Sequence, residues 1–318
     1  MYIKKPKSID FSLITCYYFT KATVNFMSLP DLLKGNHSEE KLMKFTKRIF
    51  TSILAVIMTA MLVTGCTSSE NTTDTTQPAS KYSIETMNEG KLTIGMEIEY
   101  PPFEEYAEDG VTPTGYDIDL AKAIGDKLGL EVEFINTALD GILKGIGVNY
   151  DCVISAITIT EERKESVLFT DAYIDNYQAV VVPANSDLQI TSLNDLDGKT
   201  VALQKKSSSD ALIEDMTGKG TISCTKVAQE RVATCFTQLA NGEVDVALID
   251  STVADGFVAD APDKFKIAYL DKTAPEQFGI AVGKQDTELQ KALNEILDEL
   301  EAEGFLADNY KKWFGSAE

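Results

Sequence analysis

Arg163 and Asp250 are the residues of this 318-residue chain best suited to contact a charged ligand. Arg163 follows Thr160 by three residues, in the order Thr-Glu-Glu-Arg that is typical of a capped helix start. Its planar guanidinium can bind two carboxylate oxygens at once, although an arginine in a first helical turn is commonly a solvated surface group. Asp250 follows the apolar run 244–249, at a strand end where α/β proteins bind ligands, or else it caps the next helix. The pattern alone leaves these alternatives open.

Several catalytic and metal-binding chemistries lack the residues that they need. The only histidine is His37, which lies in an N-terminal part that we expect to be removed. Without it the mature chain has no histidine base, no Ser–His or Cys–His nucleophile and no histidine metal ligand. Cys152, Cys224 and Cys235 remain, with no C-x-x-C spacing, so we expect neither a metal nor another cofactor. An exported chain could form a Cys224–Cys235 disulfide, which the sequence does not decide.

The charge of the chain argues against one class of partner. It carries 50 Asp and Glu against 29 Lys and Arg, and the resulting formal net charge of -21 is spread along its length. Nucleic-acid binding needs a concentrated basic face. We therefore expect no nucleic-acid partner.

Residues 43–65 have the pattern of an export signal. Three basic side chains precede an apolar run over 49–63, which is too short to span a bilayer of about 30 Å comfortably. The following Val-Thr-Gly-Cys sequence resembles a bacterial lipobox, and this resemblance implies that Cys66 is diacylated and becomes the mature N-terminus. Residues 1–42 precede the basic region, so we expect them to be an extension upstream of the true start.

The rest of the chain divides into a tether and a folded part. Residues 66–81 are rich in Ser, Thr, Asn and Asp and are expected to form a flexible tether. An apolar stripe over 120–128 ends at Gly129 and predicts a helix, and a longer stripe predicts another over 289–300. Apolar runs alternate with these stripes, which predicts an α/β protein with largely parallel sheets. The predicted strands are residues 92–96, 132–135, 152–157, 179–182, 200–203, 221–224, 244–249, 265–269 and 278–282.

Short motifs follow one another along the folded part. They are EYPPFE at 99–104, GYDIDLA at 115–121, DCVISAITITEER at 151–163, FT at 169–170, LDGK at 196–199, NGEVD at 241–245 and KWFG at 312–315. Each motif is weak by itself. Their order and spacing across residues 91–315 resemble the family 3 solute-binding proteins that serve bacterial polar amino-acid importers.

The resemblance implies a two-lobed α/β protein of the type II periplasmic-binding-protein-like fold, with two hinge crossings and a ligand cleft between the lobes. Lobe 1 would comprise residues 82–174 and 278–318, and lobe 2 residues 175–277. The chain would be a monomeric, lipid-anchored receptor on the extracytoplasmic face of the cell membrane. It would bind a free amino acid and deliver it to the permease of an ABC importer, and it would not be an enzyme.

The resemblance also implies roles for individual residues. In the resembling proteins, the arginine at the position of Arg163 binds the ligand α-carboxylate, and the aspartate at the position of Asp250 receives the ligand ammonium. An aromatic ring at the position of Tyr100 stacks over the ligand, although a tyrosine here could also be a core residue. Hydroxyls and free backbone groups at a strand end and at a helix start supply further contacts. These further contacts are Ser155, Ala156, Thr158, Ser208 and Ser209.

Two positions depart from the family pattern, and a third bears on the choice of ligand. Lys206 stands where the family usually has a glycine, just before the serine turn. Leu139 lies where many members carry an aromatic ring at the pocket wall, which suggests a different side-chain preference. Glu97 lies near the position where binders of cationic amino acids often carry an acid. It favours arginine, lysine or ornithine as the ligand, unless it is an exposed residue at a strand end.

Two other functions remain as alternatives. The same fold includes dehydratases that act on prephenate-like acids, and such chemistry needs a general acid or base in the cleft. Without histidine, only a carboxylate, lysine, tyrosine or cysteine could supply it. A receptor of this kind could also present its ligand to a separate sensor. The amino-acid motifs with Arg163 and Asp250 favour import over both.

Overall fold

The computed structural model describes residues 81–315. The expected extension 1–42, the export signal 43–65, the anchor Cys66 and nearly all of the tether 66–81 lie outside the described residues. Within the described range, no helix is both long enough and apolar enough to cross a bilayer.

Lobe 1 is the part built on a five-stranded sheet with the order β4-β1-β5-β12-β6. Its helix α3 has the predicted apolar stripe, which is buried, and ends where Gly129 adopts a left-handed φ of 69°. The longer predicted stripe is buried in the same way on α8. The elements are β1 (Lys91–Met96), β2 (Glu105–Tyr106), β3 (Pro113–Thr114), α3 (Tyr116–Leu128), β4 (Glu131–Asn136), η1 (Ile142–Gly145), β5 (Cys152–Val153), α4 (Glu161–Ser166), β6 (Val167–Phe169), β12 (Ala281–Gly283), α8 (Thr287–Ala302) and α9 (Phe305–Phe314).

Lobe 2 is the part built on a second five-stranded sheet, with the order β11-β7-β10-β8-β9. The side chains of its central strands are inside the lobe, because Val180, Leu203 and Leu248 are all fully buried. The elements are β7 (Ile174–Pro183), η2 (Leu193–Leu196), β8 (Thr200–Gln204), α5 (Ser208–Gly218), β9 (Thr225–Gln229), α6 (Val232–Asn241), β10 (Val246–Asp250), α7 (Ser251–Asp260) and β11 (Phe265–Phe278).

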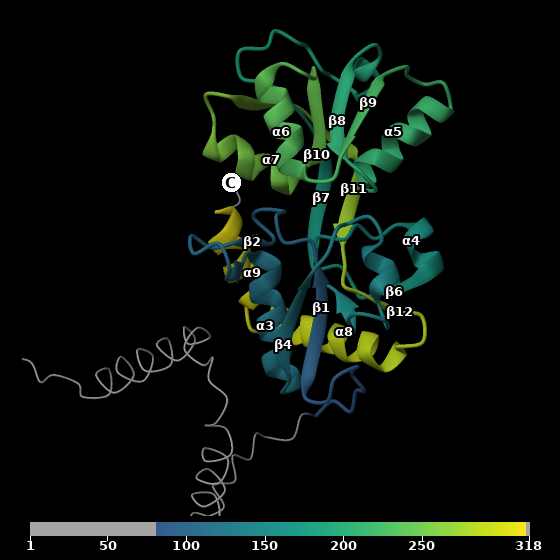
Figure 1. Cartoon of the computed structure of the whole chain (residues 1–318), viewed down its shortest axis with the longest axis vertical. Coiled ribbons are helices and arrows are strands. Elements are labelled where there is room, and N and C mark those ends of the chain that lie inside the picture. Colours follow the sequence, from purple (N-terminus) through teal and green to yellow (C-terminus); the bar gives the residue numbers. More distant parts are fainter. Residues whose placement is uncertain (1–80, 316–318) are drawn as a thin grey trace, which may run out of the picture. The chain divides into compact units, whose positions relative to one another are not determined.

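Two long strands connect the sheets. The chain leaves β6 of lobe 1, enters lobe 2 through β7, and returns through β11 to β12 of lobe 1. The two strands pair in antiparallel fashion from Phe265 opposite Pro183 to Phe278 opposite Ile174. Figure 1 shows them side by side between the lower and upper lobes. The register is irregular between Asp271 and Glu276, so part of β11 does not pair with β7.

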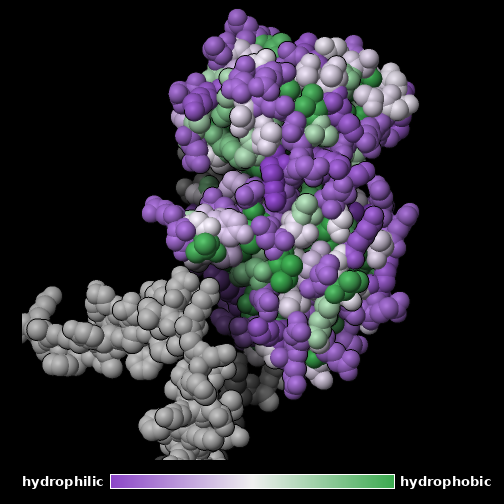
Figure 2. All heavy atoms as spheres, viewed as in Figure 1, coloured by the Kyte–Doolittle hydropathy of each residue, from purple (hydrophilic) through white to green (hydrophobic). Residues whose placement is uncertain are grey.

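The surface and the interior divide as expected for an α/β protein. On the face seen in Figure 2, hydrophilic residues predominate and apolar residues form small separate groups. The two separate sheets with their helices confirm the two-lobed α/β architecture predicted from the sequence.

The expectation of largely parallel sheets is wrong, because both sheets are mixed. Strand β1 is parallel to β4 and β5, and β8 is parallel to β9 and β10. Strand β12 is antiparallel to both of its neighbours, and β7 is antiparallel to β10 and β11. Strand β7 carries the chain into lobe 2, and β12 is the first strand after its return to lobe 1. Alternating apolar runs do not reveal that passage.

One predicted strand is misplaced. Residues 221–224 form no strand, and the edge strand β9 follows them at Thr225–Gln229. The prediction relied on the apolar Ile222, which is buried outside any strand. Strand β9 pairs with β8 on one side, and its side chains are exposed or half-buried. Main-chain pairing at the sheet edge, and not an apolar run, defines this strand.

The Cys224–Cys235 disulfide does not form. Both residues and Cys152 are free thiols in the described part of the chain. Cys235 lies on the buried face of α6, while Cys224 packs against a different apolar cluster of lobe 2. The two thiols therefore serve as small apolar side chains in separate places.

Candidate functional site

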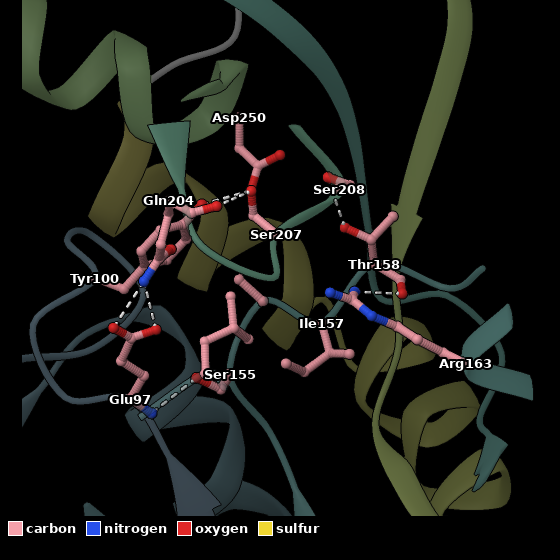
Figure 3. Close-up of a pocket in the computed structure, with 12 residues that line it drawn as sticks. Glu97, Tyr100, Ser155, Ile157, Thr158, Arg163, Gln204, Ser207, Ser208 and Asp250 are labelled. Atoms are coloured by element: carbon pink, nitrogen blue, oxygen red, sulfur yellow. Dashed lines mark hydrogen bonds between the residues drawn. The ribbon is translucent and has the colours of Figure 1, made fainter. Parts of the chain in front are cut away.

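A small cavity lies where side chains from the two lobes meet (Figure 3). It encloses about 20 Å³, whereas ligand pockets ordinarily enclose about 300–1,000 Å³, so the walls must move apart to admit an amino acid. Almost all of the site residues expected from the sequence line it. The lining residues are Glu97, Tyr100, Leu139, Ser155, Ala156, Ile157, Thr158 and Arg163 from lobe 1, and Gln204, Ser207, Ser208 and Asp250 from lobe 2.

Arg163 is positioned by the short helix α4. Thr160 is the N-cap of this helix, as predicted, and its hydroxyl accepts a hydrogen bond from the Arg163 N–H at 3.1 Å. The guanidinium donates to the backbone carbonyls of Thr158, at 2.8 Å, and of Lys206, at 3.2 Å. A guanidinium has five N–H groups, so the remaining donors can hold a carboxylate. Arg163 therefore contacts both lobes.

Asp250 ends strand β10 and is 5% exposed. It occupies the N-cap position of α7, but its side chain makes no capping hydrogen bond. Its carboxylate accepts instead from the Tyr100 hydroxyl of lobe 1 and, at 2.7 Å, from the Asn176 amide. Burial, reinforced by the nearby Glu276 carboxylate, raises the pKa of Asp250 to about 7, against the opposing effects of these hydrogen bonds and of Arg163. A ligand ammonium would favour its charged form.

A group of polar residues around Asp250 was missed by the sequence analysis. Gln178 of β7 donates to Asp250 Oδ1 at 3.2 Å and to Glu276 Oε2 at 3.0 Å. Asn176 also donates to Glu276, at 3.1 Å. Asn176 and Gln178 lie two residues apart on a strand, so their side chains share one face. This spacing could have indicated a polar site from the sequence. Glu276 gave no such signal, because only the antiparallel pairing of β11 with β7 brings it here.

The loop after β5 forms the floor of the site. Ala156 has an unusual positive φ of 45°, and its N–H donates to the buried Asp117 carboxylate at 2.7 Å. The Ser155 hydroxyl accepts from the Glu97 N–H at 3.0 Å and donates to Glu104. Thr158 contacts Ser208 across the cleft at 3.4 Å. These bonds fix a loop whose backbone and hydroxyl groups line the cavity.

The serine turn of lobe 2 lies at the start of α5. Ser208 lines the cavity and hydrogen-bonds to Glu276 at 3.1 Å. Ser209, which we expected to contact the ligand, does not line the cavity; its buried hydroxyl donates to Gln178 at 2.6 Å. Lys206 adopts a φ of 64°, the left-handed conformation that glycine tolerates best. The turn is thus made without a glycine, at a cost of about 1–2 kcal/mol in backbone strain.

The cavity end opposite Arg163 carries a second charge. Figure 3 shows Glu97 and Gln204 at this end, with the amide of Gln204 directed at the Glu97 carboxylate. Glu97 is 3% exposed, so it is not the solvated strand-end residue of the alternative interpretation. Burial raises the pKa of Glu97 to about 7, and the positive charge of Arg231 opposes that rise. Leu139 also lines the cavity, as expected.

The chain is similar in sequence and in structure to known amino-acid-binding proteins. The model of the bacterial extracellular solute-binding proteins, family 3, matches residues 92–316. The arginine-binding extracellular protein ArtP of Bacillus subtilis (strain 168) is 30% identical over 225 residues, which cover 70% of this chain and 86% of that protein. The structure of an ancestral arginine-binding protein bound to arginine has a TM-score of 0.66 and 38% identity, covering 71% of this chain and 99% of that one. Another similar structure is that of the ancestral amino acid-binding protein AncCDT-1, a precursor of cyclohexadienyl dehydratase, with a TM-score of 0.65, 32% identity, and coverage of 71% and 96%.

Proposed function

Since this chain belongs to the bacterial extracellular solute-binding proteins of family 3, we propose that it binds a free polar amino acid between its lobes and delivers it to the permease of an ABC importer. One observation carries the proposal. Arg163 of lobe 1 and Asp250 of lobe 2 line one cavity, with donors and an acceptor suited to the carboxylate and the ammonium of one amino acid. A ligand that bridges them binds the closed form better than the open form and so favours closure.

The side chain of the ligand is proposed from the opposite end of the cavity. A buried carboxylate there, Glu97, suits a cationic group such as that of arginine, lysine or ornithine. The names of similar proteins support this proposal, since both ArtP and the ancestral protein are described as arginine-binding. Leu139 offers no aromatic surface, so aromatic stacking on the ligand would come from Tyr100, which lines the same cavity.

The hinge and the lobe boundaries are also part of the proposal. We propose hinge crossings in β7 and β11, with lobe 1 formed by residues 82–174 and 278–318 and lobe 2 by residues 175–277. Both strands belong to the sheet of lobe 2 and are joined in the chain to β6 and β12 of lobe 1, which supports this division. Changes in a few backbone angles there would open the cleft.

The location of the protein is proposed from the N-terminal sequence. Residues 43–65 would direct export, and lipid on Cys66 would hold a monomeric receptor at the extracytoplasmic face of the membrane through the tether 66–81. Residues 1–42 would precede the true start. Changing Cys66→Ala should abolish labelling by radioactive palmitate, and unchanged labelling would contradict the anchor.

A thermal-shift screen tests the ligand proposal. The chain is heated with each of the twenty amino acids, cystine and ornithine. A ligand at 100 times its dissociation constant should stabilise the folded state by about 2.7 kcal/mol. No shift with any of them would contradict amino-acid binding. We also propose that the chain is not an enzyme, so mass spectrometry of the incubated ligand should show it unchanged; conversion would favour dehydratase-like chemistry instead.

A further inference from the structure

A second pair of opposite charges joins the lobes beside the ligand cavity. Arg231, at the N-cap of α6 in lobe 2, donates from Nη1 to Glu97 Oε1 at 2.9 Å. Its Nε lies 3.1 Å from Glu99 Oε2. Both oxygens of Glu97 also accept from the Gln204 amide, each at 2.7 Å. Glu97 therefore has a cationic partner supplied by the protein itself.

Arg231 does not line the cavity, whereas Glu97 does. The Arg231 guanidinium thus pairs with the Glu97 carboxylate from outside the cavity lining. Its side chain is 31% exposed, against 4% for Glu97, so the pair lies between the cavity and solvent. A ligand side chain that enters beside Glu97 therefore meets a carboxylate that already has a cationic partner, which Glu97 shares with the more exposed Glu99.

This pairing has a consequence for ligand choice. The like charge of Arg231, about 5 Å away at an effective dielectric constant of about 20, would weaken the binding of a cationic side chain by roughly two- to three-hundredfold. Water screens a partly exposed charge, which reduces the effect to about tenfold. A neutral side chain does not experience this repulsion. Because Arg231 pairs with Glu97, a neutral ligand also does not leave the buried Glu97 carboxylate without a cationic partner.

We propose that Arg231 is a specificity-determining residue, which neutralises Glu97 and so lets the site accept neutral polar side chains as well as cationic ones. This inference rests on the proposed binding of a free amino acid. It predicts that arginine and glutamine bind the wild-type chain with affinities less than about a thousandfold apart. It also predicts that loss of the Arg231 charge shifts the preference toward arginine.

A purely structural role for Arg231 makes a different prediction. As a bond between lobes, it would stabilise the closed form and strengthen every ligand equally. The chain offers a matched control for this role in Lys205 of lobe 2, which pairs with Asp140 of lobe 1 at 2.9 Å. Neither partner of that ion pair lines the ligand cavity.

The test is calorimetric titration of arginine and glutamine into the wild type and three variants. Both ligands end in a planar group with N–H donors, and only arginine carries a side-chain charge. Arg231→Gln should raise the ratio of arginine to glutamine affinity about tenfold. Arg231→Lys should return the ratio toward the wild-type value. Lys205→Gln should move both affinities together and leave the ratio unchanged.

Several outcomes would overturn the inference. They are an unchanged or lowered ratio in Arg231→Gln, a shift of equal size in Lys205→Gln, and a wild type that binds arginine but no measurable glutamine. Melting curves without ligand show whether each variant folds, and Arg231→Met replaces Arg231→Gln if that variant does not. A wild type that binds no amino acid at all refutes the proposed function, and this inference with it, whereas binding with an unchanged ratio refutes the inference alone.

Discussion

The two ends of the cavity are built from the same charges in opposite arrangement. At one end lobe 1 supplies the cation, Arg163, and lobe 2 supplies the anion, Asp250. At the other end lobe 1 supplies the anion, Glu97, and lobe 2 supplies the cation, Arg231. Arg231 pairs with Glu97 directly. Within the described residues no ion pair joins Arg163 to Asp250, because each is held by neutral groups.

The difference separates recognition of the amino-acid head group from recognition of its side chain. Neutral hydrogen-bond partners hold Arg163 and Asp250 in place without cancelling their charges, so a zwitterion can pair with both. At the side-chain end the protein cancels the charge itself. We infer that the first end recognises the α-carboxylate and α-ammonium of any amino acid and that the second end discriminates between side chains. The following experiments test this division.

The largest effect is expected at Arg163. Arg163→Ala should weaken the best ligand by about 2–5 kcal/mol, or roughly thirtyfold to several-thousandfold, because a buried ligand carboxylate loses its partner. Arg163→Lys should recover only part of this loss, since one ammonium cannot reproduce a two-pronged contact. Calorimetry measures both affinities.

A melting curve of the unliganded Arg163 variant is the control, because the fold should survive. Tight binding by a folded Arg163→Ala chain would contradict the role of the head-group end. Comparable losses for arginine and glutamine would support it, since every amino acid carries the same α-carboxylate.

The next largest effect concerns pH at Asp250. Its pKa is raised to about 7 by burial and Glu276, while pairing with an ammonium requires the ionised form, so binding should release a proton. Affinity for a neutral amino acid should therefore fall as pH is lowered from 8 to 5, by up to about tenfold per unit below 7.

Asp250→Asn separates this group from other titrations. The variant should bind weakly at every pH and lose most of the slope. Glutamine is the ligand of choice, because a neutral side chain leaves the titration of Glu97 with little influence. A slope that persists in Asp250→Asn would assign the pH dependence to another residue.

A smaller and selective effect is expected at the side-chain end. Glu97→Gln removes the anion that faces the ligand side chain and leaves Arg231 paired with Glu99 alone. Arginine should lose about 1.5–3 kcal/mol, the worth of a hydrogen bond to a charged group, while glutamine should change much less. Equal losses for the two ligands, measured by calorimetry, would show that this end does not distinguish side chains.

The smallest effect concerns stability at the turn between the ends. Lys206→Gly should raise the free energy of unfolding by about 0.5 kcal/mol, because relief of left-handed strain slightly exceeds the entropy cost of glycine. Lys206→Ala is the matched control, since it removes the side chain and keeps the strain. Chemical denaturation compares them, and a gain in both variants would assign the effect to the side chain.

Much of the fold was predictable because apolar periodicity reflects burial directly. The stripes of α3 and α8 became buried helix faces, and the apolar runs of β1, β8 and β10 became central strands. The strand at residues 221–224 was wrong, because β9 is defined by pairing at the sheet edge. The mixed sheets were also missed, since strand direction depends on how the chain passes between the lobes.

The candidate site was predictable where a residue's neighbours in the sequence reveal its place. Arg163 follows a capping threonine, and Asp250 ends an apolar strand, so each had a local signal. Their roles as ligand contacts stay predictions. Ser209 shares the local signal of Ser208 but does not line the cavity, because adjacent residues at a helix start point in different directions.

Local patterns and motif order were sufficient to predict the family, the two-lobed architecture and the residues suited to an amino-acid head group. The pairing of Arg231 with Glu97, 134 positions away, and the approach of Glu276 to Asp250 became visible only in the folded structure. No periodic pattern in the sequence identifies which residue a charged side chain will pair with. The effect of a charge depends on distance and burial, and both are set when the chain crosses between lobes and brings their facing edges together.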